Sequence, residues 1–187
     1  MRQLIVTEFI TLDGVVDSPG GGDHPEAGWT FRGIETDTAM FDLKAREEQE
    51  AGALLLGRQS YAEFAPIWPT MEEFATYNAM PKYVVSTTLT EVDPGWLPTE
   101  ILRSTDDVAA LKETEGGPLL LTASPTLAQS LAAAGLVDRY HLLTFPVVLG
   151  HGKRLFATDA ERADRLRLVE HATYPNGVQM QVLDVVR

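Results

Sequence analysis

The feature that most constrains the fold is an alternation of short apolar runs with amphipathic segments along most of the chain. Residues 53–56 are apolar throughout, which is typical of a strand buried on both faces of a parallel sheet. In the segment before them, Met40, Leu43, Glu47 and Ala51 share one face at helical spacing. Repeated alternation of this kind predicts a parallel sheet with helices on both faces.

The closing part of the chain follows a different pattern, because two alternating runs flank Pro175-Asn176-Gly177, a strong hairpin signal. We therefore expect a three-layer α/β/α fold with a mostly parallel central sheet and a C-terminal antiparallel hairpin. With neither a repeat nor a linker in 187 residues, one domain over 1–187 is expected. Strands are predicted over 3–10, 53–56, 82–86, 118–122, 139–148, 166–174 and 178–186. Helices are predicted over 36–52, directly after residue 57, and over 70–79, 105–114 and 125–134.

Composition removes several classes of function. The formal net charge is −12, which disfavours nucleic acid and anionic membranes as partners. The chain has no Cys, so disulfides and thiolate chemistry are excluded. The N-terminal run MRQLIVTEFI resembles a strand and not a signal peptide. No apolar stretch approaches ~20 residues, so no membrane span and a cytoplasmic location are expected.

Three predicted strand ends carry hydroxyls, a glycine or free backbone amides where the chain enters a helix or turn. In open α/β sheets, ligands bind outside these carboxyl ends, and helix N-termini there suit phosphate. Arg58 adds a planar cation for a phosphate group. Alternatively, these residues are only helix caps and turns. No GxGxxG follows a strand, which disfavours an ordinary Rossmann site. The three segments are Gly57-Arg58-Gln59-Ser60, Ser86-Thr87-Thr88 and Thr122-Ala123-Ser124-Pro125.

Five stretches of the chain resemble the dihydrofolate-reductase-like family, and most of all the reductase domain of bacterial riboflavin biosynthesis, the RibD C-terminal domain. They are TEFITLDGVVD, ALLLGRQSYAEF, PKYVVSTTLT, LLLTASPTLAQSLAAAGLVDRYHLLTFPVVLGHGKRLF and the last hairpin. The resemblance covers nearly the whole chain, and the set GR-x-[ST], VVST and PVVLGxGKRLF is fairly specific. It implies NADPH as hydride donor and a small heterocyclic substrate such as a pyrimidine or pterin.

The resemblance also assigns cofactor contacts residue by residue. Arg58 and Ser60, after Gly57, would lie by the phosphates, and Ser86 and Thr87 would hold the 2′-phosphate region. The pyrophosphate would be lined by Ala123, Ser124 and Thr126. Ala123 stands where the family has glycine, and its methyl group occupies space where backbone must approach phosphate closely.

The proton donor of such a reduction is not determined by the sequence. Asp13 ends the first strand but also forms an Asp-Gly turn. Asp37 and Asp42 open the first helix, where folate reductases carry a carboxylate, but neither fits that spacing and both suit a solvated helix face. Thr144 lies in a strand facing the site, or is an ordinary strand residue. The four His residues show no metal-ligand spacing, so no metal is expected.

Two loops are candidates for the substrate mouth. Residues 15–33 hold too many glycines and prolines for a regular element, and we expect a lid in which Trp29 and Phe31 either stack on a heterocycle or anchor the loop. In the second loop, His151, Lys153 and Arg154 form a cationic cluster, either for an anionic substrate or paired with surface carboxylates. His151 stands where glycine is common in the family.

Three hypotheses from different classes are compatible with the sequence. The chain is an NADPH-dependent reductase, a non-catalytic nucleotide-binding module that kept the fold, or a purely structural partner protein that binds no nucleotide. The resemblance further implies a homodimer. The apolar residues of the last strand, Val178, Met180, Val182 and Val185, would supply its contact or would pack in the core instead.

Overall fold

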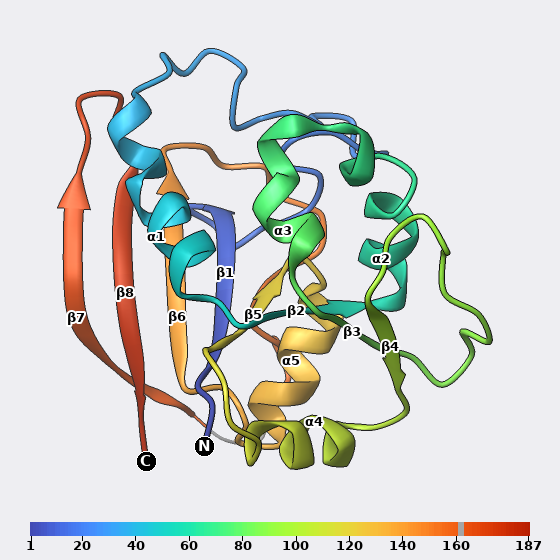
Figure 1. Ribbon diagram of the computed structural model, residues 1–187. Coiled ribbons are helices and arrows are strands. Elements are labelled where there is room, and N and C mark those ends of the chain that lie inside the picture. The colour runs from blue at the N-terminus through green and yellow to red at the C-terminus, as the bar shows by residue number, and fades with distance from the viewer. Residues whose placement is uncertain (161–162) are drawn as a thin grey trace.

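A computed structural model, which describes residues 1–160 and 163–187, contains one eight-stranded sheet (Figure 1). The strand order across the sheet is β4-β3-β2-β5-β1-β6-β8-β7. The strands are β1 (Leu4–Thr11), β2 (Ala53–Gly57), β3 (Lys82–Val85), β4 (Thr99–Leu102), β5 (Leu119–Thr122), β6 (Arg139–Phe145), β7 (Arg165–Thr173) and β8 (Gln179–Val186).

The first six strands, β1 through β6, are parallel wherever they pair with one another. Strand β8 pairs antiparallel with both of its neighbours, β6 and β7. The last two strands form the predicted hairpin, in which Gly177 has a φ of +85° at the turn. A bulge between Leu168 and Glu170 shifts the register of that hairpin. The predicted mixed sheet with a C-terminal antiparallel hairpin is confirmed.

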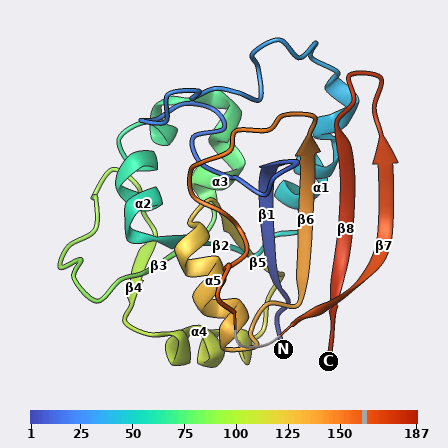
Figure 2. The same ribbon diagram turned by 180° about the vertical axis from the view of Figure 1, so that it is seen from behind.

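Helices cover both faces of the sheet (Figures 1 and 2). Helices α1 (Asp42–Glu50), α2 (Arg58–Phe64) and α3 (Ala75–Ala79) follow β1 and β2 in the chain, whereas α4 (Thr105–Lys112) and α5 (Pro125–Ala133) precede and follow β5. Residues from α2 and α3 pack with one set of strand residues, and residues from α4 and α5 pack with the alternate set. The α1 helix adds a third cluster over β6 and β8.

Alternation along β1 shows how the sequence assigns its residues to the two faces. Leu4, Val6 and Ile10 pack with α4 and α5, and Ile5 packs on the opposite face with α2 and α3. Leu54, Leu55 and Leu56 of β2 are all fully buried, as a strand covered by helices on both faces requires.

Several predicted boundaries differ from the structure for local reasons. The helix predicted over 36–52 begins as a 3-10 turn, Thr38–Phe41, before α1. The helix predicted over 70–79 is α-helical only in its last five residues, because 3-10 turns at Trp68–Thr70 and Glu72–Phe74 come first. Strand β6 ends at Phe145, before the proline that cannot donate to a ladder.

Strand β4 was not predicted from the sequence. It has four residues, pairs only with β3 at the sheet edge, and buries only Leu102. Such a short edge strand lacks the apolar run that marks the central ones, so its pairing is decided by the neighbouring strand.

Candidate functional site

The carboxyl ends of β2 and β5 are joined by side-chain hydrogen bonds. The Ser124 Oγ accepts a bond from the Gly57 N–H at 2.8 Å and donates to the Ser60 Oγ at 2.7 Å. Both serines are buried. A Cβ on Gly57 would lie 3.3 Å from the Cβ and Oγ of Ser124, so glycine permits this close approach of the two strand ends. We call Gly57, Ser60, Ala123 and Ser124 the cradle.

The backbone of the cradle is strained on the β5 side. Ala123 and Ser124 both have positive φ, at 54° and 64°, and Ser124 then caps α5 with Pro125 in its first turn. L-residues rarely adopt this conformation, and such outliers cluster at ligand-binding and active sites. The family glycine expected at residue 123 corresponds to a position that favours glycine here too.

Cationic and hydroxyl groups surround the cradle. Arg58 is exposed at the start of α2, and its side chain has no hydrogen bond or ion pair within residues 1–160 and 163–187. The Ser86 Oγ accepts bonds from the N–H groups of Thr88 and Leu89, which shapes the turn after β3 and leaves Thr87 exposed. Thr126 is exposed in the first turn of α5.

Arg103, which sequence reasoning did not single out, lies beside the turn after β3. Its Nη1 donates to the carbonyls of Ser86 at 2.9 Å and Leu89 at 2.7 Å. It follows β4 directly, so predicting that strand would have placed this arginine at the same edge of the sheet as Ser86.

The Asp13 side chain links the turn after β1 to the segment 149–154, which follows β6. Its carboxylate accepts bonds from the N–H groups of Leu149 and Gly150 and from the Thr11 hydroxyl. Burial opposes ionisation, but these bonds outweigh it and lower the pKa of Asp13. An acid that stays ionised in this way is a poor source of protons, and its partners give it the turn role.

The other three candidate residues, Asp37, Asp42 and Thr144, lie outside that turn. Asp37 accepts a bond from the Ala39 N–H at 3.0 Å as the cap of the first 3-10 turn. Asp42 is exposed in the first turn of α1. Thr144 is half-buried in β6, level with Ile10 of β1.

The two predicted mouth loops contact one another. The rings of His24 and His151 stack at 4.7 Å, and the His24 Nε2 lies 3.3 Å from the His151 carbonyl. Lys153 pairs with Asp17, and Arg154 pairs with Asp13, each at 3.8 Å. Lys153 and Arg154 therefore face carboxylates of the 13–17 segment, which agrees with the alternative that they pair with surface carboxylates.

The structure also separates the roles of the two aromatic residues in the 15–33 loop. Trp29 is buried, donates from its indole N–H to the Asp17 carbonyl, and meets the Phe145 ring edge-on at 5.5 Å. Trp29 thus anchors the loop, whereas Phe31 is 56% exposed and free to contact a ligand.

A buried polar network that the sequence analysis missed lies between α1 and the sheet. The Glu47 Oε1 accepts from the Thr7 hydroxyl at 2.7 Å and lies 2.8 Å from the His141 Nδ1. Lys44 contacts both Thr7 and Glu47, and its Nζ lies 5.1 Å from the centre of the Phe9 ring. Burial opposes ionisation of Glu47, but Lys44, His141 and Thr7 together lower its pKa.

One strand residue has the opposite character. Glu8 is 4% exposed, and its Oε1 has no hydrogen-bond partner within the described residues. Burial raises the pKa of Glu8 to about 8. The positive charge of Lys44 opposes this shift, and the negative charge of Glu47 adds to it. One signal in the sequence marks it, a charged residue within an otherwise apolar run of a predicted strand.

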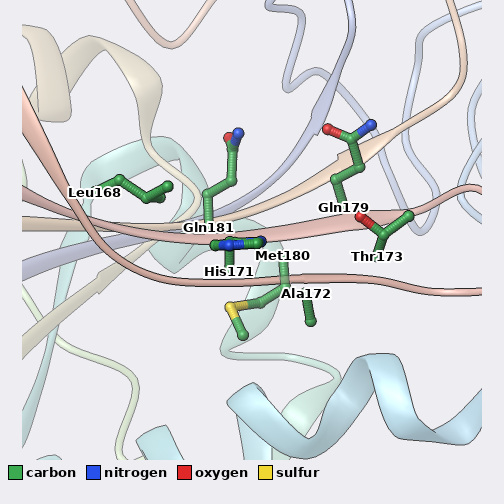
Figure 3. A pocket seen from close by; sticks show the side chains of 7 residues that line it. All are labelled: Leu168, His171, Ala172, Thr173, Gln179, Met180 and Gln181. Atoms are coloured by element: carbon green, nitrogen blue, oxygen red, sulfur yellow. The ribbon is translucent and has the colours of Figure 1, made fainter.

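A concavity lies away from the cradle, on the β7–β8 hairpin (Figure 3). The side chains of Gln179 and Gln181 project from one face of the hairpin, and those of Met180 and Ala172 from the other. Its lining residues are Leu168, His171, Ala172, Thr173, Gln179, Met180 and Gln181. The sheet order separates it from β2 and β5, so it is not part of the cradle.

Residues 1–160 and 163–187 contain neither a cluster of metal ligands nor a membrane-spanning helix. No three or more His, Cys, Asp and Glu side chains in these ranges are grouped as metal ligands. No helix in the same ranges has the length and hydropathy to cross a bilayer.

Comparisons with known proteins agree with this geometry. The chain is 28% identical to an uncharacterised protein of Bacillus subtilis strain 168, YyaP, over 95% of this chain and 92% of that one. A Shewanella sp. PV-4 protein named for riboflavin biosynthesis shares the fold with a TM-score of 0.79 at 20% identity, each chain being covered completely. Dihydrofolate reductase from Enterococcus faecalis, solved with NADP(H), has a TM-score of 0.64 at 12% identity, with 99% and 97% of the chains covered.

The family model for the RibD C-terminal domain matches residues 2–180. That match spans the strand ends, the network under α1 and most of the hairpin. The chain belongs to the RibD C-terminal domain family and has the dihydrofolate-reductase-like fold.

Proposed function

We propose that this protein is an NADPH-dependent reductase of a small heterocyclic substrate. The observation that carries the proposal is the cradle, where two parallel strand ends meet through Ser124, and beside it Arg58, whose side chain has no partner among residues 1–160 and 163–187. Solved structures of the same fold include an enzyme with NADP(H) and a Thermotoga maritima protein named as a deaminase and 5-amino-6-(5-phosphoribosylamino)uracil reductase. The chain covers 57% of that Thermotoga protein.

The residues present suit a dinucleotide phosphate. The backbone after β5 turns at Ala123 and Ser124 into the nine-residue α5, whose first N–H groups have no helical acceptor. Arg58, Ser86, Thr87 and Arg103 would meet the 2′-phosphate region, and Thr126 the pyrophosphate. When bound, NADPH supplies a hydride for the substrate. The chain's own residues supply the phosphate contacts, the closure and the proton.

The 15–33 loop would close over the bound cofactor and substrate. Trp29 holds one part of it to the core, and the His24–His151 and Asp17–Lys153 contacts hold another part to the 150–153 segment. Phe31 and the glycines 20–22 between Asp17 and His24 are exposed. A loop fixed at defined points and loose between them can exclude water from a reduction.

The second copy of a homodimer would sit at the hairpin edge. Val178, Met180 and Val182 are buried in the core of this chain, so they are not available as the contact. The exposed apolar side chains of β7 are Leu166, Leu168 and Val169, on an edge strand that pairs only with β8. We propose that these three residues form the contact.

Fluorescence titration and NADPH oxidation together test the proposed function. Purified protein is titrated with NADPH and with NADH, and NADPH oxidation is then followed with dihydrofolate and with 5-amino-6-(5-phosphoribosylamino)uracil. Preferred binding of NADPH and oxidation with either compound support a reductase. Binding without oxidation favours the non-catalytic nucleotide-binding module, and absence of NADPH binding refutes both.

A further inference from the structure

Glu8 is a buried acid for which this chain provides no partner. Its side chain lies in the middle of β1, and its Oε1 is without a hydrogen bond in residues 1–160 and 163–187. Burying a carboxyl without a partner costs free energy, and the ionised form costs far more than the neutral one. Groups held in such a state are found disproportionately at functional sites.

Strand register places Glu8 in the same row as the cradle. Thr7 of β1 pairs with Thr122 of β5, so Glu8 is level with Ala123. Leu55 of β2 pairs with Leu121 of β5, so Gly57 is level with Ala123 as well. Glu8, Ala123 and Gly57 therefore lie in one row across the neighbouring strands β1, β5 and β2, at the carboxyl ends of β2 and β5 and in the second half of β1.

The charges around Glu8 are few. From α1, Lys44 and Glu47 act on it, and Glu47 is already bonded to Thr7 and His141. Helix α5, on the face where Val6 and Ile10 of β1 pack, contains no charged residue. In the segment that follows β6, Lys153 and Arg154 are paired with Asp17 and Asp13. No cation is thus dedicated to Glu8 among the described residues.

We propose that Glu8, in the strand row of the cradle, is the general acid of the reduction and faces the nicotinamide when NADPH is bound. The inference rests on the proposed reductase function. A general acid must hold its proton at working pH, and the alternatives do not. The pKa of Asp13 and that of Glu47 are both lowered, whereas that of Glu8 is raised. Carboxyls whose pKa values are pushed apart by their surroundings mark acid and base roles in known enzymes.

The proton step is balanced as follows. The O–H bond of Glu8 breaks, and its proton goes to the nitrogen or oxygen of the substrate C=N or C=O group. The π electron pair of that group forms the new N–H or O–H bond, and the hydride for the carbon would come from bound NADPH, which would leave as NADP⁺. Glu8 is left as a carboxylate and regains its proton from solvent.

The first test measures the Glu8 proton directly and needs no substrate. Protein labelled with ¹³C at glutamate carboxyls is titrated by NMR, and the Glu8 resonance is identified as the one lost in both Glu8→Gln and Glu8→Leu. Glu8 is expected to be protonated at pH 7 and to titrate near its raised pKa of about 8. A Glu8 that is ionised at pH 7 overturns the proposal.

The second test asks whether Glu8 faces the nicotinamide. NADP⁺ should shift the Glu8 resonance, because its cationic ring favours the carboxylate, and 2′-phospho-ADP-ribose, which lacks the ring, should not. The exposed Glu100 in β4 provides a control resonance that neither ligand moves. Equal shifts with both ligands, or no shift with either, refute this inference. If NADP⁺ still binds, the proposed function remains supported.

The third test uses turnover. Glu8→Gln should lower kcat by roughly 10²–10⁴-fold, the usual contribution of a general acid, and leave the Kd for NADPH unchanged. The kcat of the unmodified protein should fall as pH rises through about 8, and Glu8→Gln should lack that fall. Glu100→Gln is the matched control, with unchanged kcat. A Glu8→Gln variant with full kcat overturns the proposal.

Discussion

Replacing Ala123 by glycine should stabilise this protein, although glycine usually destabilises. Ala123 has a φ of 54°, in the left-handed region. An L-residue there is disfavoured by about 1–2 kcal/mol, and glycine loses about 0.5–1 kcal/mol more chain entropy on folding. The methyl group is only half-buried, so its loss adds little. Ala123→Gly should therefore raise the free energy of unfolding by about 0.5–1 kcal/mol.

The matched control is the same chemical change in an ordinary helical position. Ala110 is exposed in α4, so Ala110→Gly should lower the free energy of unfolding by about 1 kcal/mol. Urea unfolding monitored by circular dichroism gives both values, and the Tm of Ala123→Gly should rise by about 1–4 °C. Equal destabilisation of the two variants would refute the assignment of strain to Ala123.

Four further outcomes are expected. Arg58→Ala should weaken NADPH binding by roughly 1.5–3 kcal/mol, the range for a hydrogen bond to a charged group, and leave NADH binding nearly unchanged in fluorescence titration. Trypsin should cut the 15–33 loop at Arg32, which is exposed, and NADPH with substrate should slow that cut; an unchanged rate removes the lid. Light scattering should give a dimer mass that Leu168→Glu reduces to the monomer, and a monomer before mutation ends the dimer proposal. Folding raises the pKa of Glu8 from 4.5 to about 8, so the folded state binds the proton more tightly and stability falls as pH rises between those values. Glu8→Gln should remove that part of the pH dependence, as urea unfolding at several pH values will show.

Local patterns were enough to predict most of the fold. Apolar runs such as 53–56 and the Pro175-Asn176-Gly177 turn act over a few residues, and their meaning does not depend on distant contacts. They gave the strand order in sequence, the carboxyl ends of β2 and β5, and the final hairpin. The edge strand β4 escaped prediction because its pairing with β3, and not its own residues, defines it.

For several residues the sequence allowed two alternative roles, and tertiary contacts distinguish between them. Trp29 was as consistent with stacking on a ligand as with anchoring the loop, until its bond to Asp17 and its contact with Phe145 fixed the second role. Lys153 and Arg154 had two alternatives that only the position of the 13–17 segment separates. In each case the deciding partner lies more than ten residues away in the chain.

The sequence by itself determined the elements, their order and the ends at which a phosphate group would be bound, because period and turn chemistry are local. Tertiary structure alone decided which groups meet beneath those ends. His141 reaches Glu47 across 94 positions of the chain, and Gly57 reaches Ser124 across 67. The row of Glu8, Ala123 and Gly57 exists only through the register of three strands. The raised pKa of Glu8 follows from its burial, which removes it from water and leaves its Oε1 without a hydrogen-bond partner among the described residues. No pattern within β1 carries that information.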